Sequence, residues 1–141
     1  MGSNPFTPFV LGRYNVLRAI DALGEVMRVV RVSAIVETAA LDAPAGSPPF
    51  LNAVVTGYTS MDPLAMMNAL LAMETRLGRA PRRTRNEPRV IDLDLILHGA
   101  TRMRSHALTL PHPRAVAREF VMGPMRQVSA AAAAYVARNA R

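Results

Sequence analysis

The spacing of apolar residues changes several times along the chain and predicts an alternation of helices and strands. Over residues 12–27, apolar side chains recur every three or four positions, which predicts a helix. From 30 to 36, apolar and polar residues alternate, as in a strand with one buried face. Residues 39–49 carry three prolines and a glycine, so we expect a loop there, followed by a second strand over 50–59.

Residues 62–78 carry the strongest helix signal in the chain. Asp62 can cap the N-terminus, Pro63 stands at the first helical position, and Gly78 marks the end. The apolar positions between these residues follow helical spacing: Leu64, Met67, Leu70, Leu71 and Leu77. This stretch is therefore predicted to form the second helix.

The second half of the chain begins with residues 90–97, whose apolar character predicts a central strand. We expect a short helix over 114–119, a further strand over 120–122, and a helix-prone, alanine-rich tail over 129–141 with little to pack against. The order helix, strand, strand, helix, strand predicts an α+β fold with a mixed or antiparallel sheet. The length of the chain favours a single domain spanning 1–141.

Composition narrows the chemistry that such a domain can carry out. All 17 basic residues are arginine, and with ten acidic residues they give a net charge of +7. The absence of lysine and cysteine from the sequence excludes a Schiff-base lysine, a P-loop lysine and a thiolate metal site. Apolar stretches end well before the ~18 residues that would span a membrane, so we expect a soluble, cytoplasmic protein without a membrane partner.

Two carboxylates in the predicted central strand are the first candidates for chemistry. Asp92 and Asp94 stand two residues apart, so strand alternation puts both on one side of the sheet. Aspartate is disfavoured in strands, and a pair of carboxylates together with substrate phosphates is the usual way to hold Mg²⁺. The alternative to a metal site is that the two aspartates simply lie on a solvent-facing side of the strand.

An arginine-rich stretch comes directly before this strand: Arg79, Arg82, Arg83, Arg85 and Arg89. Taken alone, such a run is typical of a solvated surface loop. Arginine is also the residue suited to bidentate recognition of phosphate. An arginine cluster next to a carboxylate pair favours a site for a metal ion and a polyphosphate.

Four further residues have both a structural and a functional interpretation. Glu74 interrupts the apolar stripe of the second predicted helix, either as a helix-surface partner or as a ligand contact. His112 is held between two prolines, which aims its side chain, although an ordinary loop histidine fits as well. Phe50 and Phe120 belong either to the core or to a site that stacks a planar heterocycle.

Several motifs in this order resemble the 6-hydroxymethyl-7,8-dihydropterin pyrophosphokinase family over nearly the whole chain. The segments that carry the resemblance are Gly2-Ser3-Asn4, Phe50-Leu51-Asn52-Ala53, Leu77-Gly78-Arg79, Pro88-Arg89-Val90-Ile91-Asp92-Leu93-Asp94, Pro111-His112-Pro113-Arg114 and Arg118-Glu119-Phe120-Val121-Met122. The resemblance implies a ferredoxin-like sandwich. It also implies an enzyme of folate biosynthesis that transfers pyrophosphate from ATP to the hydroxymethyl group of the pterin and releases AMP.

The resemblance implies roles for individual residues. Asp92 and Asp94 would bind two Mg²⁺ ions that bridge the triphosphate and the attacking hydroxyl, with Arg79 and Arg89 completing the catalytic set. ATP contacts are implied for Glu74, Arg79, Arg82, Arg83, Arg89, Leu95, Thr109, His112 and Arg118. Pterin contacts are implied for Thr38, Leu41, Phe50, Asn52 and Phe120, with the two phenylalanines stacking on the ring.

The sequence departs from the family pattern at two places that bear on activity. The family has an apolar strand before Gly2-Ser3-Asn4, so the first strand of the sheet is expected to be missing. The proline-rich pterin loop is altered after Thr38. One alternative is therefore a truncated or non-catalytic paralogue that binds nucleotide or pterin. A basic ferredoxin-like RNA-binding module is weaker, because it leaves the aspartates unexplained. We expect small-molecule partners, no nucleic acid, and a monomer or weak dimer.

Overall fold

The computed structural model describes residues 5–11, 16–38, 50–78 and 91–140. The main sheet in these ranges has six strands, and every pairing within it is antiparallel. The strands are β1 (Pro5–Leu11), β2 (Arg28–Val32), β3 (Val36–Thr38), β4 (Phe50–Tyr58), β5 (Ile91–Leu93) and β6 (Leu97–His98). The order is β2-β4-β1-β5, with β3 also paired to β4 and β6 to β1. The predicted α+β class with an antiparallel sheet is confirmed.

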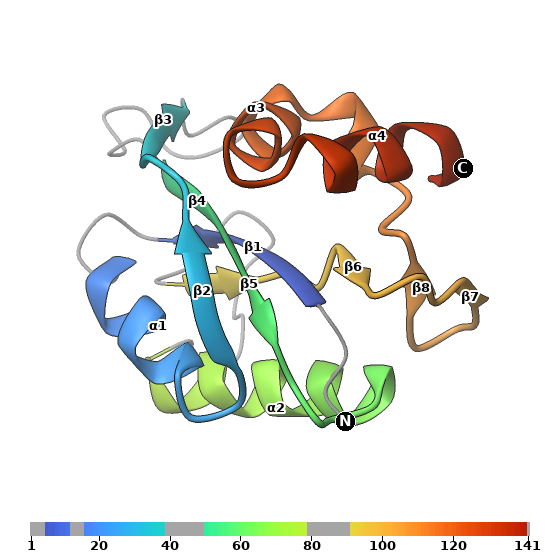
Figure 1. Ribbon diagram of the computed structural model, residues 1–141. Helices are drawn as coiled ribbons and strands as arrows, with labels where there is room; N and C mark the ends of the chain where they lie inside the picture. Colours follow the sequence, from blue (N-terminus) through green and yellow to red (C-terminus); the bar gives the residue numbers. More distant parts are fainter. Residues whose placement is uncertain (1–4, 12–15, 39–49, 79–90, 141) are drawn as a thin grey trace, which may run out of the picture.

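Helices cover both faces of this sheet. Figure 1 shows α1 (Val16–Leu23) and α2 (Pro63–Arg76) on one side, and α3 (Glu119–Val128) and α4 (Ala130–Asn139) on the other. A small hairpin of β7 (Met103–Arg104) and β8 (Thr109–Leu110) and a 3-10 turn, η1 (Ala115–Ala117), connect β6 to α3. None of the helices in the described ranges has the length and apolar character to cross a bilayer.

The strand expected to be missing is the one that precedes Gly2-Ser3-Asn4 in the family, whereas β1 follows this motif. β1 therefore takes a central place in the sheet without being that strand. It lies inside the sheet, paired with β4 on one edge and with β5 and β6 on the other. Prolines in this segment hid the strand, because proline is rare in central strands. Pro8 is tolerated because it falls between the residues that pair with β6 (Pro5 and Phe6) and those that pair with β5, which begin at Phe9.

Two predicted strands are each divided in the structure. The strand expected over 30–36 becomes β2 and β3, separated at residues 33–35, where Ser33 bonds to the backbone of Val54. The strand expected over 90–97 becomes β5 and β6. Between them the carbonyl of Ile96 accepts a hydrogen bond from the His112 amide (2.9 Å) instead of joining the ladder.

The expected strand over 120–122 is wrong, because these residues lie in α3. Its buried side chains follow helical spacing: Val121, Met122, Met125 and Val128. The pair Gly123-Pro124 obscured this pattern, since both residues usually break helices. The expected helix over 12–27 is shorter in the structure, and the short helix over 114–119 reduces to η1.

The alanine-rich tail forms α4, as predicted, but it does have a packing partner. Ser129 caps the helix, its hydroxyl accepting from the Ala132 amide (3.1 Å). Ala132, Ala133 and Val136 are buried in the cluster that α3 also forms, and the Tyr135 hydroxyl donates to the carbonyl of Ala100 (3.1 Å). Small side chains therefore let α4 lie close against its neighbours.

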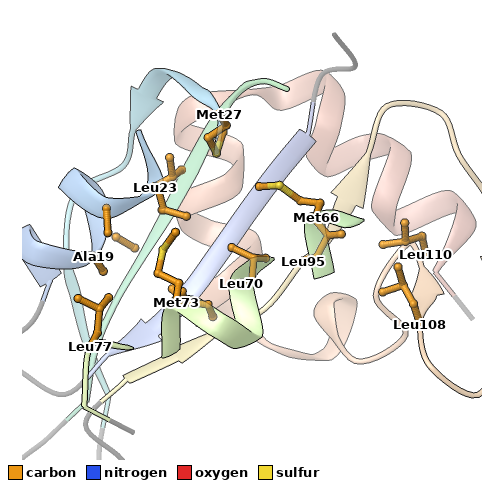
Figure 2. Close-up of a cluster of buried hydrophobic side chains, with 14 residues drawn as sticks. Ala19, Leu23, Met27, Met66, Leu70, Met73, Leu77, Leu95, Leu108 and Leu110 are labelled. Carbon is orange, nitrogen blue, oxygen red and sulfur yellow. The ribbon is translucent and has the colours of Figure 1, made fainter. Parts of the chain in front are cut away.

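The core on the opposite face is built from α1, α2 and the sheet. Figure 2 shows Leu23, Met66, Leu70 and Met73 gathered against the strands, with Leu108 and Leu110 continuing the cluster. The prediction for α2 is confirmed at both ends. The Asp62 carboxylate accepts from the Ala65 amide (2.8 Å), and the helix stops before Gly78, whose φ of +113° suits glycine.

Two adjacent leucines of α2 test this account of the core. Leu70 is 1% exposed and Leu71 is 47% exposed. Leu70→Ala should lower the free energy of unfolding by about 2–5 kcal/mol, because it leaves a cavity in the core. Leu71→Ala, the matched control, should change it by about 0.5 kcal/mol or less. Urea unfolding followed by circular dichroism measures both, and similar losses in the two variants would contradict this packing.

Candidate active site

A cavity of about 520 Å³ lies beside the C-terminal end of β5. We call it the Asp92 cavity. It is lined by residues 92–95, by the hairpin residues 105–109, by 112–114, and by Arg118 and Met67. The sequence thus brings together residues from five separate segments, and most of them carry polar or charged side chains.

Asp92 and Asp94 both line this cavity and are half-buried, whereas Leu93 between them is in the core. Both carboxylates therefore share a side, as the alternation predicts, although Asp94 lies just past the end of β5. Their oxygen atoms suit Mg²⁺. The described residues contain no group of three or more histidine, aspartate or glutamate side chains that could hold a metal ion.

Glu74 is buried (3% exposed) and lies in the wall between α2 and β5. Its Oε2 atom accepts a hydrogen bond of 2.5 Å from the backbone amide of Leu93, between the two aspartates. A buried carboxylate that accepts a backbone amide is a strong anchor, because the bond is charge-assisted. Glu74 does not line the Asp92 cavity. Its expected contact with ATP stays a prediction, while its contact with Leu93 fixes β5 against α2.

His112 lines the Asp92 cavity with its ring orientation fixed by neighbouring backbone. Its Nδ1 atom accepts from the amide of Arg114 (3.2 Å), so the neutral ring carries its proton on Nε2. Burial, together with the positive charges of Arg118 and Arg114, lowers the pKa of His112 from 6.5 to about 4. The ring is therefore neutral at physiological pH and can donate one hydrogen bond.

Arg118 connects the Asp92 cavity to a second one. Its side chain is half-buried in the first cavity, and its guanidinium carbon lies 5.8 Å from the centre of the Phe120 ring. Phe120 lines the second cavity, of about 590 Å³, which we call the Phe120 cavity. Because a guanidinium over an aromatic face is held by a cation–π attraction, this contact fixes the two cavities side by side.

The Phe120 cavity runs between the β3 segment and α3. Ala34, Val36 and Thr38 form one wall, and residues of α3 from Glu119 to Gln127 form the other. Asn52 lies behind the first wall and is 1% exposed; its Nδ2 donates to the carbonyl of Val36 (3.1 Å) and to the Thr38 hydroxyl (3.0 Å). Its Oδ1 atom is buried and has no hydrogen-bond partner among the described residues.

The remaining predicted site residues fall into three groups. Leu95 and Thr109 line the Asp92 cavity, as expected for residues of one site. Phe50 pairs with Thr38 through its backbone. Outside the described residues lie Leu41, Arg79, Arg82, Arg83 and Arg89.

Met67, Arg114 and His106 are among the residues that line the Asp92 cavity and that sequence reasoning missed. Met67 was assigned only to the apolar face of its helix, and its spacing of seven residues from Glu74 is the signal that could have placed both near β5. Arg114 directly follows the Pro-His-Pro motif. His106 sits near the tip of the hairpin, where nothing in the sequence pattern marks it.

Comparison with known proteins adds relatives to this geometry. A "2-amino-4-hydroxy-6-hydroxymethyldihydropteridine pyrophosphokinase" of Pseudomonas aeruginosa is 34% identical over 131 residues, covering 92% of this chain and 77% of the relative. One of the same name from Synechocystis is 37% identical over 82 residues, or 58% and 42% of the two chains. A "Folate synthesis bifunctional protein" of Arabidopsis thaliana is 37% identical over 78 residues, 55% of this chain and 16% of the relative.

The chain spans less than half the length of six curated relatives that it matches, several of which are bifunctional proteins. A family model, by contrast, matches residues 1–130, which include β1, both cavities and all of α3. That model describes 7,8-dihydro-6-hydroxymethylpterin-pyrophosphokinase, abbreviated HPPK. On this match and on the similarity to the Pseudomonas enzyme, the chain belongs to the HPPK family.

Proposed function

We propose that this chain is a single pyrophosphokinase domain with a ferredoxin-like sandwich fold. It transfers the terminal pyrophosphate of ATP to the hydroxymethyl group of 6-hydroxymethyl-7,8-dihydropterin and releases AMP, a step of folate biosynthesis. The observation that carries this proposal is the contact of Arg118 with Phe120, which joins a cavity with two carboxylates to a cavity with an aromatic wall. The printed names of the curated relatives support the same reaction.

In this reaction the hydroxymethyl oxygen attacks the β-phosphorus of ATP. The bond between that phosphorus and the oxygen bridging to the α-phosphate breaks, AMP leaves with the bridging oxygen, and the hydroxyl proton passes to solvent. Such a transfer depends on alignment and on neutralising charge more than on covalent catalysis. We therefore assign no side chain as an obligatory general base.

Asp92 and Asp94 are the residues that would hold magnesium, as two ions, at the wall of the Asp92 cavity. When bound, Mg²⁺ neutralises the triphosphate and orients the reacting oxygens. The chain's own part is to hold both carboxylates in position. Glu74 supports this through the Leu93 amide, so it acts as a positioning residue for the strand that carries the two acids.

The cationic wall of the same cavity suits the phosphates of ATP. Arg118 supplies charge, and neutral His112 supplies a single Nε2 donor to a phosphate oxygen. Arg79, Arg82, Arg83 and Arg89 would add further guanidinium groups. Leu95, Thr109 and Met67 offer apolar surface and a hydroxyl for the nucleoside.

The Phe120 cavity suits a planar pterin. The ring of Phe120 provides a stacking surface, with Phe50 as its proposed counterpart. The buried Oδ1 atom of Asn52 is an acceptor with no hydrogen-bond partner among the described residues, and a pterin presents N–H donors along one edge. Thr38 holds the Asn52 amide in place. Leu41, three positions further along the sequence, is the remaining proposed pterin contact.

Replacing either aspartate tests the proposed reaction. Wild-type protein incubated with Mg²⁺, ATP and the hydroxymethyl-dihydropterin should release AMP. Asp92→Asn and Asp94→Asn should each slow release on the order of 10²-fold or more, because metal-based charge stabilisation is worth several kcal/mol. Asp21→Asn, which removes an exposed acid of α1, is the matched control and should keep full activity. Wild-type binding of pterin without any AMP would favour the non-catalytic paralogue.

Titration of His112 gives a second test. The folded pKa of about 4 lies below the ordinary value of 6.5, so the unfolded chain takes up the proton first as pH falls. The stability that neutral His112 contributes is therefore complete above pH 6.5 and is lost progressively down to pH 4. His112→Gln should flatten the stability curve in this window. Nuclear magnetic resonance titration of the imidazole without nucleotide should give a midpoint near 4, and a midpoint near 6.5 would refute the buried, cation-flanked setting.

A further inference from the structure

The segment between β2 and β3 leaves the regular ladder beside the Phe120 cavity. Val32 pairs with Val55 and Val36 with Asn52, so residues 33–35 lie between two paired regions. Two hydrogen bonds of Ser33 take the place of the ladder in this segment. Its amide donates to the carbonyl of Val54 and its hydroxyl accepts from the Val54 amide, both at 2.9 Å.

The next amide along, that of Ala34, bonds to the opposite wall of the cavity. It donates to the Oε1 atom of Gln127 at 2.7 Å, across 93 positions of sequence. Ala34 and Gln127 both line the Phe120 cavity. A longer contact of 3.5 Å from the Arg31 guanidinium to the carbonyl of Val128 runs between the same two segments. The side-chain carboxamide of Gln127 thus joins the two walls of the Phe120 cavity directly.

Gln127 stands at the end of the cavity away from the Arg118 contact. It follows Phe120 by seven residues on α3, which is two helical turns on one face and about 10 Å along the axis. Phe120 and Arg118 mark the end nearest the Asp92 cavity. The bond between Gln127 and Ala34 therefore closes the far end.

The other hydrogen bonds of the wall that Gln127 holds run away from α3. The three-residue strand β3 pairs with β4, the Nδ2 atom of Asn52 bonds to Val36 and Thr38, and Ser33 bonds to Val54, whereas Ala34 is exposed. An exposed hydrogen bond contributes little to stability, so its loss leaves the domain folded. The same loss leaves the wall less firmly held. A ligand binds more weakly when the walls of its cavity must become ordered on binding.

We propose that Gln127 is a positioning residue for the pterin site: its carboxamide fixes the separation of the β3 segment from α3 and so preorganises the Phe120 cavity for a planar ring. This inference rests on the proposed function, since it takes the pterin as the occupant of that cavity. It assigns Gln127 no contact with the reacting atoms.

Three variants separate positioning from general stability. Gln127→Met keeps the length and helix propensity of the side chain but removes the amide acceptor. Gln127→Glu keeps an acceptor oxygen for the Ala34 amide. Asn68→Met removes an exposed amide from α2, where it lines neither cavity, and serves as the matched control. The measurements are the pterin dissociation constant by fluorescence, KM for each substrate, kcat and Tm.

Gln127→Met should weaken pterin binding about five- to tenfold, the equivalent of one hydrogen bond, with KM for ATP nearly unchanged. Gln127→Glu should restore affinity to within about twofold of wild type, and Asn68→Met should behave as wild type.

Two results would overturn the inference alone: wild-type affinity in Gln127→Met, or an equal rise in both KM values with no rescue by Gln127→Glu. A wild-type protein that neither binds pterin nor releases AMP would instead overturn the proposed function and the inference together.

Discussion

The strand β4 is the constraint on which the rest of the structure depends. It is hydrogen-bonded to β1 along one edge and to β2 and β3 along the other. Its side chains are divided between the two cores, with Ala53 and Val55 facing α1 and α2, and Val54 facing α3 and α4. A strand buried on both faces tolerates few polar side chains, because each must find a partner. Asn52 and Thr56 are buried polar side chains of β4, and Asn52 occurs where the strand passes behind the Phe120 cavity.

Patterns that depend on local chemistry could be predicted from the sequence. The cap at Asp62, the helical spacing of α2 and the two-residue spacing of the aspartates all appear in the structure as expected. Features that depend on tertiary context could not be predicted from the sequence. Pro8 argues against a central strand until its place between two pairings is known, and Gly123-Pro124 argues against α3 until its buried residues are seen to share a face.

The candidate site shows the same division. Asp92, Asp94 and His112 could be selected because their residue types are unusual at those positions. Met67 and Gln127 could not be selected in this way. An apolar residue on an amphipathic helix is ordinary, and so is a polar residue at an exposed position. Their importance comes from the cavities they line, which form only when distant segments meet. The electrostatics follow from the same meeting, since burial beside Arg114 and Arg118 keeps His112 neutral.

The helix α4 has a consequence for where this domain ends. The family match stops at residue 130, the first residue of α4, yet Val136 and Ala140 beyond it are buried with Val121 and Met125 of α3. A boundary drawn from family similarity would therefore cut through a continuous hydrophobic cluster. The residues that match the family and the residues that pack together therefore have different limits, and Ala132, Ala133 and Val136 leave room for close packing against α3 only while they stay small and apolar.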